Sequence, residues 1–522
     1  MTWDGGYPSE LPYTSSYYVE HAPAHLRLVP LLRGIHGPRI KDGFRLLELG
    51  CGSGTSMVTM AAANPLSEFV GIDFAPAQIA TGNRLIEKSG LTNVELVEAD
   101  FLEIQHEAGE IFGQFDYVIC HGVYTWVSNE IRSALVQILK GVMAPGGVLF
   151  MGYNSMPGWS GAFGLQRLIS DFAKYEHGDT DIRVREAIRK VKALSDQGFQ
   201  GINFDYLPPS IRDSLDDLDS VPKANFRYVA HEYLSQAWSP IFRGDLVRDL
   251  SEAKLSLVGS TRLLDAFPET LGSEEQRALM GQVSPELGPQ LMEMIAPPRF
   301  RRDVFIKGRA PLTDQQRAQQ LADTPVALVR TASEFEYEVD VHRGTAEIPK
   351  VNYEPLIDAL EGRPRALGDL LEMSRSAGSN LSPEELMGML ITSCQVMPAA
   401  DADAQATEMT RQANRALIEF ALNDPAAHQL ALASAVLGAG LPTETANMAL
   451  YDIVARTKGT DVEPDVETMK DELIAAILGR GEAFLQDGEQ VDDPEQIRKI
   501  AGIAIDKGLT DFSARWSALG MI

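Results

Sequence analysis

Between residues 44 and 154, short apolar runs alternate with stretches of helical periodicity. The runs FRLLELG, EFVGIDF, VELVEAD, YVICHG and GGVLFMGYN have the length of buried strands, and the segments between them have the apolar spacing of helices. Strands that alternate with helices form a parallel sheet that is covered on both faces. Because such sheets bind ligands at the carboxyl ends of their strands, the pattern also predicts where a site should lie.

The first of these strands runs directly into a glycine turn, residues 50–55, with the sequence Gly-Cys-Gly-Ser-Gly-Thr. A dinucleotide-binding GxGxxG motif does not fit, because the third glycine comes one residue too early. A P-loop does not fit either, because the Gly-Lys-Ser/Thr ending is missing. Glu48 precedes the turn, so the motif reads E-x-G-x-G-x-G.

Acidic residues end the next two strands. Asp73 follows the turn by about 20 residues, where a carboxylate accepts hydrogen bonds from ribose hydroxyls. Asp100 ends the third strand and is a candidate acceptor for an adenine amino group, and the adjacent Phe101 ring can stack on the base. The turn and the two acids together predict a site for a ligand that contains a nucleoside.

These residues make the region from Phe44 to Asn154 resemble the class I S-adenosylmethionine-dependent methyltransferases. In that family, glycines at the positions of this turn let the backbone approach the methionine part of the cofactor, and the two acids hold ribose and adenine. The resemblance implies S-adenosylmethionine as cofactor, S-adenosylhomocysteine as product and no metal. The expected cofactor-binding residues are Glu48, Gly50, Cys51, Gly52, Gly54, Asp73, Phe74, Gln78, Asp100, Phe101 and His121.

Aromatic and polar residues follow the fourth and fifth strands, in CHGVYTWVSNE and MGYNSMPGW, and the loop ELPYTSSYYVEHAP precedes the first strand as a possible lid. Methyl transfer needs an aligned, unprotonated acceptor, and tryptophans can stabilise an alkylammonium by cation–π contact. For each aromatic residue, ordinary packing explains its presence equally well. The candidate catalytic residues are His121, Tyr124, Tyr153 and Asn154, and the candidate pocket or lid residues are Tyr13, Tyr17, Tyr18, Trp126 and Trp159.

The 522 residues predict roughly three domains at ~150 residues each. The cofactor-binding core with its lid takes residues 1–155, and a helical insertion for capping or dimerisation takes 156–225. Residues 226–309 complete the sheet, with SLVGSTRLL as a sixth strand and FRRDVFIKG as an antiparallel seventh. Beyond the polar linker RAPLTDQQRAQQLAD we expect two mainly α domains: a winged-helix-like one at 310–400 and a helical one at 401–522, with an alanine-rich helix in LASAVLGAGLPTETANMALYDIVA.

The stretch RYVAHEYL to RFRRDVFIKG resembles the methyltransferase regulatory region of a bacterial subgroup. Together with YNSMPGW and PYTSSYYVEHAP, it is similar to rickettsial lysine methyltransferases that modify outer-membrane proteins. The resemblance implies transfer to lysines of a protein substrate, and a homodimer. The alternative is a small-molecule O- or N-methyltransferase with accessory assembly domains. A scaffold without activity would be expected to have lost the turn or the acids, and all of them are present.

The composition excludes several other classes. A net charge of −27 opposes binding to nucleic acid or to an anionic membrane. Three scattered cysteines make neither a disulfide framework nor a zinc site, and the pair His231-Glu232 lacks the second histidine of H-E-x-x-H. No signal sequence and no run of ~18 apolar residues occurs, so we expect a cytoplasmic protein without membrane insertion.

Overall fold

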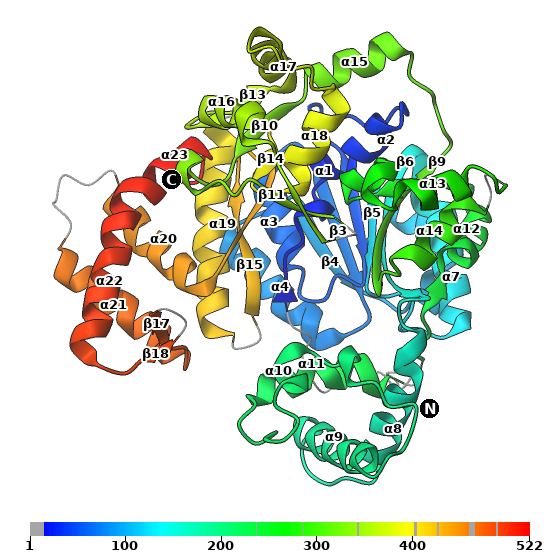
Figure 1. Cartoon of the computed structure of the whole chain (residues 1–522). Coiled ribbons are helices and arrows are strands. Elements are labelled where there is room, and N and C mark those ends of the chain that lie inside the picture. Colours follow the sequence, from blue (N-terminus) through cyan, green and yellow to red (C-terminus); the bar gives the residue numbers. More distant parts are fainter. Residues whose placement is uncertain are drawn as a thin grey trace.

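The structure is a computed structural model that describes residues 15–235, 237–284, 287–341, 344–400, 404–424, 427–458, 465–486 and 489–522. Its centre is a sheet with the strand order β4-β3-β2-β5-β6-β9-β8, a Rossmann-like order (Figure 1). The strands from β4 to β6 are parallel, whereas β9 runs antiparallel between β6 and β8. The strands predicted from the apolar runs, including the antiparallel seventh, are confirmed: β2 (Arg45–Leu49), β3 (Glu68–Asp73), β4 (Val94–Glu98), β5 (Phe115–His121), β6 (Met143–Met156), β8 (Leu255–Ser260) and β9 (Phe300–Lys307).

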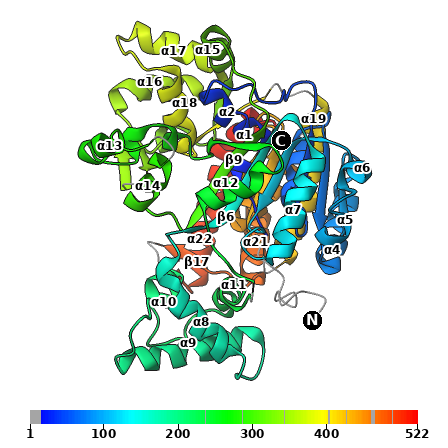
Figure 2. The ribbon, with the colours of Figure 1, turned by 90° about the vertical axis from the view of Figure 1, so that its right-hand side faces the viewer.

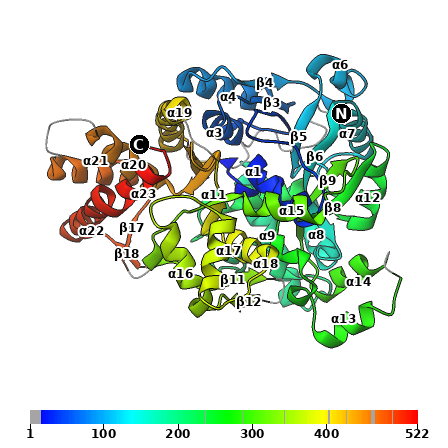
Figure 3. The same cartoon turned by 90° about the horizontal axis from the view of Figure 1, so that it is seen from above.

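Helices cover both faces of this sheet (Figure 3). Successive residues of a strand point to opposite faces, so Leu46 of β2 belongs to one apolar cluster and Leu47 to another. The Leu46 cluster includes residues of α1 (Pro23–Leu26), α2 (Leu28–Leu32), α3 (Thr55–Ala63) and α4 (Pro76–Ser89). The Leu47 cluster includes residues of α5 (Phe101–Ile104), α6 (Ala108–Phe112), α7 (Asn129–Val142) and α12 (Arg243–Ser251).

The segment after β6 leaves the sheet and forms a helical lobe, which lies below the core in Figures 1 and 2. It returns to the core at β7 (Ile241–Phe242), which pairs with the end of β6. The lobe has an apolar cluster of its own, to which Trp159 and Trp238 also belong. Its helices are α8 (Phe163–Ala173), α9 (Thr180–Asp196), α10 (Pro209–Arg212) and α11 (Lys223–Leu234).

The stretch 309–323, expected to be a linker, is instead largely helical. Thr313 forms a capping box with Gln316 and starts α15 (Asp314–Ala322), and Leu321 is buried in the main core. The middle domain then combines three helices with a three-stranded antiparallel sheet of order β13-β10-β14, the elements of a winged-helix-like module. Ser382 caps its third helix, since its hydroxyl accepts a hydrogen bond from the Glu385 N–H (3.0 Å). Its elements are β10 (Pro325–Leu328), β11 (Glu338–Val341), β12 (Gly344–Glu347), α16 (Lys350–Leu360), β13 (Arg365–Ala366), α17 (Leu367–Ser376), α18 (Pro383–Thr392) and β14 (Val396–Pro398).

The C-terminal part also departs from expectation. The first half of the segment predicted to hold an alanine-rich helix is not helical. It forms the end of β15 (Ala427–Ser434) and all of β16 (Ala439–Thr443), and these two strands pair antiparallel. Only the second half of the segment is helical. The N-terminal strand β1 (Ser15–Ser16) adds to β15 in parallel. The remaining elements are α19 (Ala404–Asn423), α20 (Thr445–Thr457), α21 (Val466–Gly479), β17 (Phe484–Gln486), β18 (Glu489–Val491), α22 (Pro494–Lys507) and α23 (Ser513–Ala518).

Across the described ranges, no helix combines the length and the apolar character needed to cross a membrane.

Candidate active site

The glycine turn follows β2 and has an unusual backbone. Gly50, Gly52 and Gly54 have φ angles of +78°, +56° and +66°, a region that side chains other than glycine rarely occupy. A Cβ atom added to Gly50 would lie 2.4 Å from the Val123 side chain, and one added to Gly54 would lie 2.7 Å from the Leu96 side chain. Close packing therefore requires glycine at these two positions. At Gly52 a Cβ would meet nothing within 4 Å. The middle of the turn therefore borders open space, into which a ligand can fit.

Asp73 at the end of β3 holds this turn in place. Its Oδ2 accepts a hydrogen bond from the Gly52 N–H (2.9 Å), and its Oδ1 accepts one from the Ala75 N–H (2.9 Å). Burial raises the pKa of Asp73, and these backbone hydrogen bonds oppose the shift. Glu48 is buried in β2, and burial together with the Asp73 charge raises its pKa to about 8. The structure thus brings Glu48, the turn and Asp73 together, as the sequence predicts.

The end of β4 lies next to the end of β3, because the two strands pair in parallel up to Asp73 and Glu98. Asp100 follows, is exposed, and caps α5 by accepting a hydrogen bond from the Leu102 N–H (2.8 Å). Phe101 is half-buried at the edge of the core. The Asp100 carboxylate and the Phe101 ring therefore follow the strand that is next to the one ending in Asp73.

The other predicted cofactor residues fall into two groups. Phe74, just beyond β3, and Gln78 in α4 are both half-buried near Asp73 in the chain. The Cys51 side chain packs against β3, since its sulfur would lie 2.8 Å from a Cβ placed on Gly71. The Cys51 thiol also donates to the Gly52 carbonyl within the turn (3.6 Å), and the Cys51 N–H donates to the Ile72 carbonyl (3.1 Å).

His121 ends β5 and anchors a cluster that includes residues from the N-terminal segment. Its Nδ1 shares a hydrogen bond of 2.8 Å with Nε2 of His21, and the Tyr18 ring stacks on it with a centroid distance of 4.1 Å. Arg302 of β9 forms an ion pair with Glu20 (2.9 Å) behind this cluster. Sequence reasoning missed the roles of His21, Glu20 and Arg302. The only signal for Glu20 and His21 was the short motif VEH beside the predicted lid tyrosines.

Both imidazoles of this cluster are neutral at pH 7. Burial, followed by the charge of Arg302, lowers the pKa of His121 to about 3. Burial and the neighbouring His121 also lower the pKa of His21 well below its usual value. A base this weak does not remove a proton from an ammonium group of pKa ~10. His121 is therefore better suited to shape and orient the site than to accept a proton, and its catalytic and cofactor-binding roles stay predictions.

Three predicted tyrosines are buried in hydrogen bonds instead of facing a cleft. The Tyr124 hydroxyl donates to Asp249 of α12 (3.0 Å), and the Tyr153 hydroxyl donates to Asp303 of β9 (2.7 Å). Burial raises the pKa of both hydroxyls, and the adjacent carboxylates add to this shift. Tyr17 accepts a hydrogen bond from the Gly440 N–H (2.7 Å) in the core. The catalytic roles of Tyr124 and Tyr153 and the lid role of Tyr17 therefore stay predictions, and the structure places all three in buried hydrogen bonds.

Asn154 and the two predicted tryptophans lie where the core meets the helical lobe. The Asn154 N–H donates to the Thr125 hydroxyl (3.2 Å), while its buried Nδ2 has no acceptor among the described residues. Trp159 packs edge-on against Trp238 (5.4 Å between centroids), and Trp126 lies 6.5 Å from Trp238. These tryptophans belong to the core of the lobe. Tyr13 lies outside the described residues.

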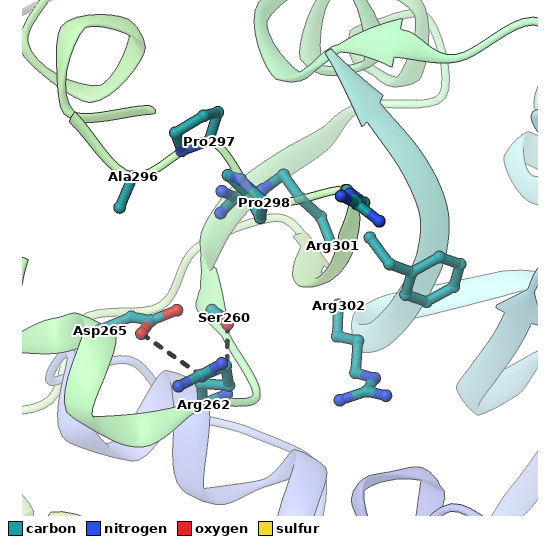
Figure 4. Close-up of a pocket in the computed structure, with 10 residues that line it drawn as sticks. Ser260, Arg262, Asp265, Ala296, Pro297, Pro298, Arg301 and Arg302 are labelled. Atoms are coloured by element: carbon teal, nitrogen blue, oxygen red, sulfur yellow. Dashed lines mark hydrogen bonds and ion pairs between the residues drawn. The ribbon is translucent and has the colours of Figure 1, made fainter. Parts of the chain in front are cut away.

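A cavity of ≈ 440 Å³ opens beside the His121 cluster (Figure 4). Its wall includes Phe300, whose ring centroid is 5.2 Å from that of His121, and Arg302. Figure 4 shows Arg262 turned toward Asp265 at one side. Phe300 and Arg302 thus lie between the cavity and the cluster, and the lining consists of Ser260, Arg262, Asp265 and residues 296–302.

The residues present fit S-adenosylmethionine. Gly52 borders open space for the methionine part, Asp73 can accept from ribose hydroxyls, and Asp100 with Phe101 can hold adenine. Within the described ranges, no group of three or more His, Cys, Asp or Glu side chains is placed to hold a metal ion.

Replacing Gly52 by alanine should weaken the binding of S-adenosylmethionine about tenfold, because the new methyl group would occupy the ligand's space. Gly146 provides the matched control, since it has a φ of +79° and also nothing within 4 Å, but lies at the start of β6. Isothermal titration calorimetry of both variants is the measurement. Equal affinities for Gly52→Ala and Gly146→Ala would mean that the open space is not the ligand site.

Known proteins resemble the chain along most of its length. Residues 40–196 match the family model of a methyltransferase domain, and residues 225–307 match that of a predicted methyltransferase regulatory domain. An uncharacterized protein of Synechocystis sp. is 29% identical over 73% of this chain and 74% of its own length. An uncharacterized protein of Rickettsia prowazekii is 29% identical over 44% of this chain and 86% of its own length.

A solved structure shares the fold over nearly the entire chain. PKMT2 from Rickettsia typhi, in complex with AdoHcy, has a TM-score of 0.67 and 18% identity, and the match covers 97% of this chain and 99% of that one. Three findings point to the same kind of protein: the fold, the E-x-G-x-G-x-G turn with its acidic strand ends, and the two family matches. The chain thus carries an S-adenosylmethionine-dependent methyltransferase domain at residues 40–196, and residues 225–307 match a predicted methyltransferase regulatory domain.

Proposed function

We propose that this enzyme transfers the methyl group of S-adenosylmethionine to lysine side chains of a protein. The observation that carries the proposal is the cluster of aromatic rings around His121 at the end of β5, where Tyr18 stacks on the imidazole and Phe300, which also lines the ≈ 440 Å³ cavity, lies 5.2 Å from it. Aromatic rings can stabilise an alkylammonium by cation–π contact, and the Arg302 guanidinium already lies 5.8 Å from the centroids of the Tyr18 and Phe300 rings. The similarity of the sequence to rickettsial lysine methyltransferases supports the same acceptor class, and the net charge of −27 favours a basic substrate.

The residues of the site have distinct tasks in such a transfer. S-adenosylmethionine supplies an electrophilic methyl group on a positively charged sulfur. The glycine turn and Asp73 orient that cofactor, and Tyr18 and Phe300 exclude water around His121. Because burial and the charge of Arg302 keep His121 and His21 neutral, the two imidazoles add no further positive charge beside the acceptor amine. The chain thus acts mainly by alignment and desolvation.

An incubation with methyl-labelled S-adenosylmethionine and cell extract tests this proposal. We expect the label in large polypeptides, and methyl-lysine after acid hydrolysis of the labelled protein. A parallel incubation without the enzyme sets the background. Label confined to small solutes would contradict the proposal and favour a small-molecule O- or N-methyltransferase, whose substrate would also fit a cavity of this size.

The proposal includes two expectations that follow from the resemblance alone. One is that an outer-membrane protein is among the acceptors, and the other is that the enzyme is a homodimer. Sedimentation analysis of the purified protein tests the second expectation.

A further inference from the structure

The cavity beside the His121 cluster has a lining rich in positive charge. Its charged residues are one aspartate and four arginines: Asp265, Arg262, Arg299, Arg301 and Arg302. The chain as a whole carries a net charge of −27, so four arginines around one cavity run against its overall balance. Guanidinium groups that gather in this way suit an anionic ligand.

Two of these arginines are paired within the protein. The Arg301 guanidinium donates to both oxygens of Asp303 (2.8 and 2.9 Å). The Nε atom of Arg302 lies 2.9 Å from a carboxylate oxygen of Glu20. The positive charge of these two side chains is therefore largely balanced by carboxylates outside the cavity lining.

The other two arginines have charge to spare. The Nε atom of Arg262 lies 3.9 Å from the Asp265 carboxylate, at the limit of an ion pair, and its Nη2 donates to the Asp340 carbonyl (3.2 Å). Arg299 is exposed, and its guanidinium carbon lies 4.2 Å from the centroid of the Tyr206 ring. Its side chain has no carboxylate partner among the described residues. Arg262 and Arg299 can therefore still bind an anion.

The same cavity borders the place where the methyl acceptor is proposed to enter. Figure 4 shows Arg262 and Arg302 on one side of it and Ala296 and Pro297 on the other. The Arg302 guanidinium lies 5.8 Å from the centroid of the Phe300 ring, which packs against His121. This positive charge opposes the approach of a lone ammonium group, whereas an acceptor that also carries a carboxylate brings the charge that offsets it.

Resting on the proposed function, we propose that the cavity binds the side-chain carboxylate of an aspartate or glutamate that lies near the target lysine in the acceptor protein. The guanidinium fork matches the two oxygens of a carboxylate. The volume of ≈ 440 Å³ is typical of a ligand cleft. Asp265 in the lining disfavours a doubly charged phosphate, and the net charge of −27 disfavours a nucleic acid.

The overall charge and the cavity act on different scales. The negative charge of the whole chain attracts a lysine-rich acceptor from a distance. The arginines of the cavity act only on contact, and they select among the lysines of that acceptor. An acceptor with many lysines and an acidic residue beside the target lysine satisfies both.

Matched pairs of acceptor proteins test the proposal. Extract protein is methylated by the wild-type enzyme with labelled S-adenosylmethionine, and mass spectrometry locates the modified lysines. Each acceptor is then produced in its natural form and with the Asp or Glu residues near the target changed to Asn or Gln. The natural form should have the higher kcat/KM by roughly 10- to 100-fold, the value expected for a hydrogen bond to a charged group. The difference should lie in KM, because the contact is made before and during transfer alike.

The double variant Arg262→Gln/Arg299→Gln should methylate both forms of an acceptor equally well. Arg84→Gln is the matched control, since Arg84 is another exposed arginine, in α4, and its side chain donates to the Thr81 hydroxyl (3.2 Å). This control should keep the wild-type preference. Both variants should bind S-adenosylhomocysteine as tightly as the wild type. If the double variant does not fold, Arg299→Gln replaces it, because Arg299 is exposed.

Three results would overturn the inference and leave the proposed function standing. The first is a wild-type enzyme that methylates both forms at the same rate, or lysines with no acidic residue nearby. The second is a folded double variant that keeps the full preference. The third is a folded double variant that no longer binds S-adenosylhomocysteine, since the cavity would then belong to the cofactor. A wild-type enzyme that labels no lysine would overturn the proposed function and the inference with it.

Discussion

Replacing Asp303 by alanine should lower the free energy of unfolding by about 3–5 kcal/mol, because the change leaves buried positive charge without its partner. Asp303 of β9 is 0% exposed. Its two carboxylate oxygens accept hydrogen bonds from the Arg301 guanidinium (2.8 and 2.9 Å), and Arg243 lies 3.5 Å away. Burial alone would raise the pKa of Asp303, but these two arginines and the Tyr153 hydroxyl bring it below its usual value.

Urea unfolding followed by intrinsic fluorescence measures this loss. Asp171→Ala is the control, since Asp171 forms ion pairs with Arg167 and Lys174 on the exposed face of α8, and the variant should unfold like the wild type. If Asp303→Ala unfolded at the same urea concentration as the wild type, the network around Tyr153 would have no structural role. Tyr153 would then be a candidate for chemistry again.

Replacing Asp73 by alanine should weaken the binding of S-adenosylmethionine by about 1.5–3 kcal/mol, or roughly 10- to 150-fold. The change removes an acceptor for the ribose hydroxyls and also releases the N–H groups of Gly52 and Ala75 from the carboxylate. Asp116 offers a matched control, because its Oδ2 likewise accepts from a backbone N–H, that of Arg45 (2.9 Å), but at the start of β5. Calorimetry on both variants gives the comparison.

The expected outcome is a weaker affinity for Asp73→Ala and an unchanged affinity for Asp116→Ala. Equal affinities in the two variants would remove Asp73 from the ribose site. The end of β3 would then serve only to hold the glycine turn.

The sequence predicted the cofactor half of the site because its signals are local. A buried run, a glycine turn and an acid at the strand end all lie within a few residues of one another, and a parallel sheet places such ends side by side. The contact between His21 and His121 spans 100 residues, and no local pattern encodes it. A partner such as Arg302 comes from a segment that reaches the site only through tertiary packing.

The tyrosine predictions depend on a weaker signal. A position near a strand end does not tell which way a side chain points, since neighbours on a strand face opposite sides. Tyr153 thus turns to Asp303 in the core, while the adjacent Asn154 has a free amide nitrogen within the described structure. The β15–β16 hairpin was missed because alanine favours helices, and contacts distant in sequence outweigh this preference: Gly440 packs against Tyr17 and Thr59.

The central claim is that the ends of β2, β3 and β4 jointly bind one molecule of the methyl donor. Isothermal titration of the purified wild-type protein with S-adenosylhomocysteine tests it most directly. We predict saturable binding of one molecule per chain. Absence of binding heat at every temperature tried, together with unchanged thermal stability in excess ligand, would contradict the account.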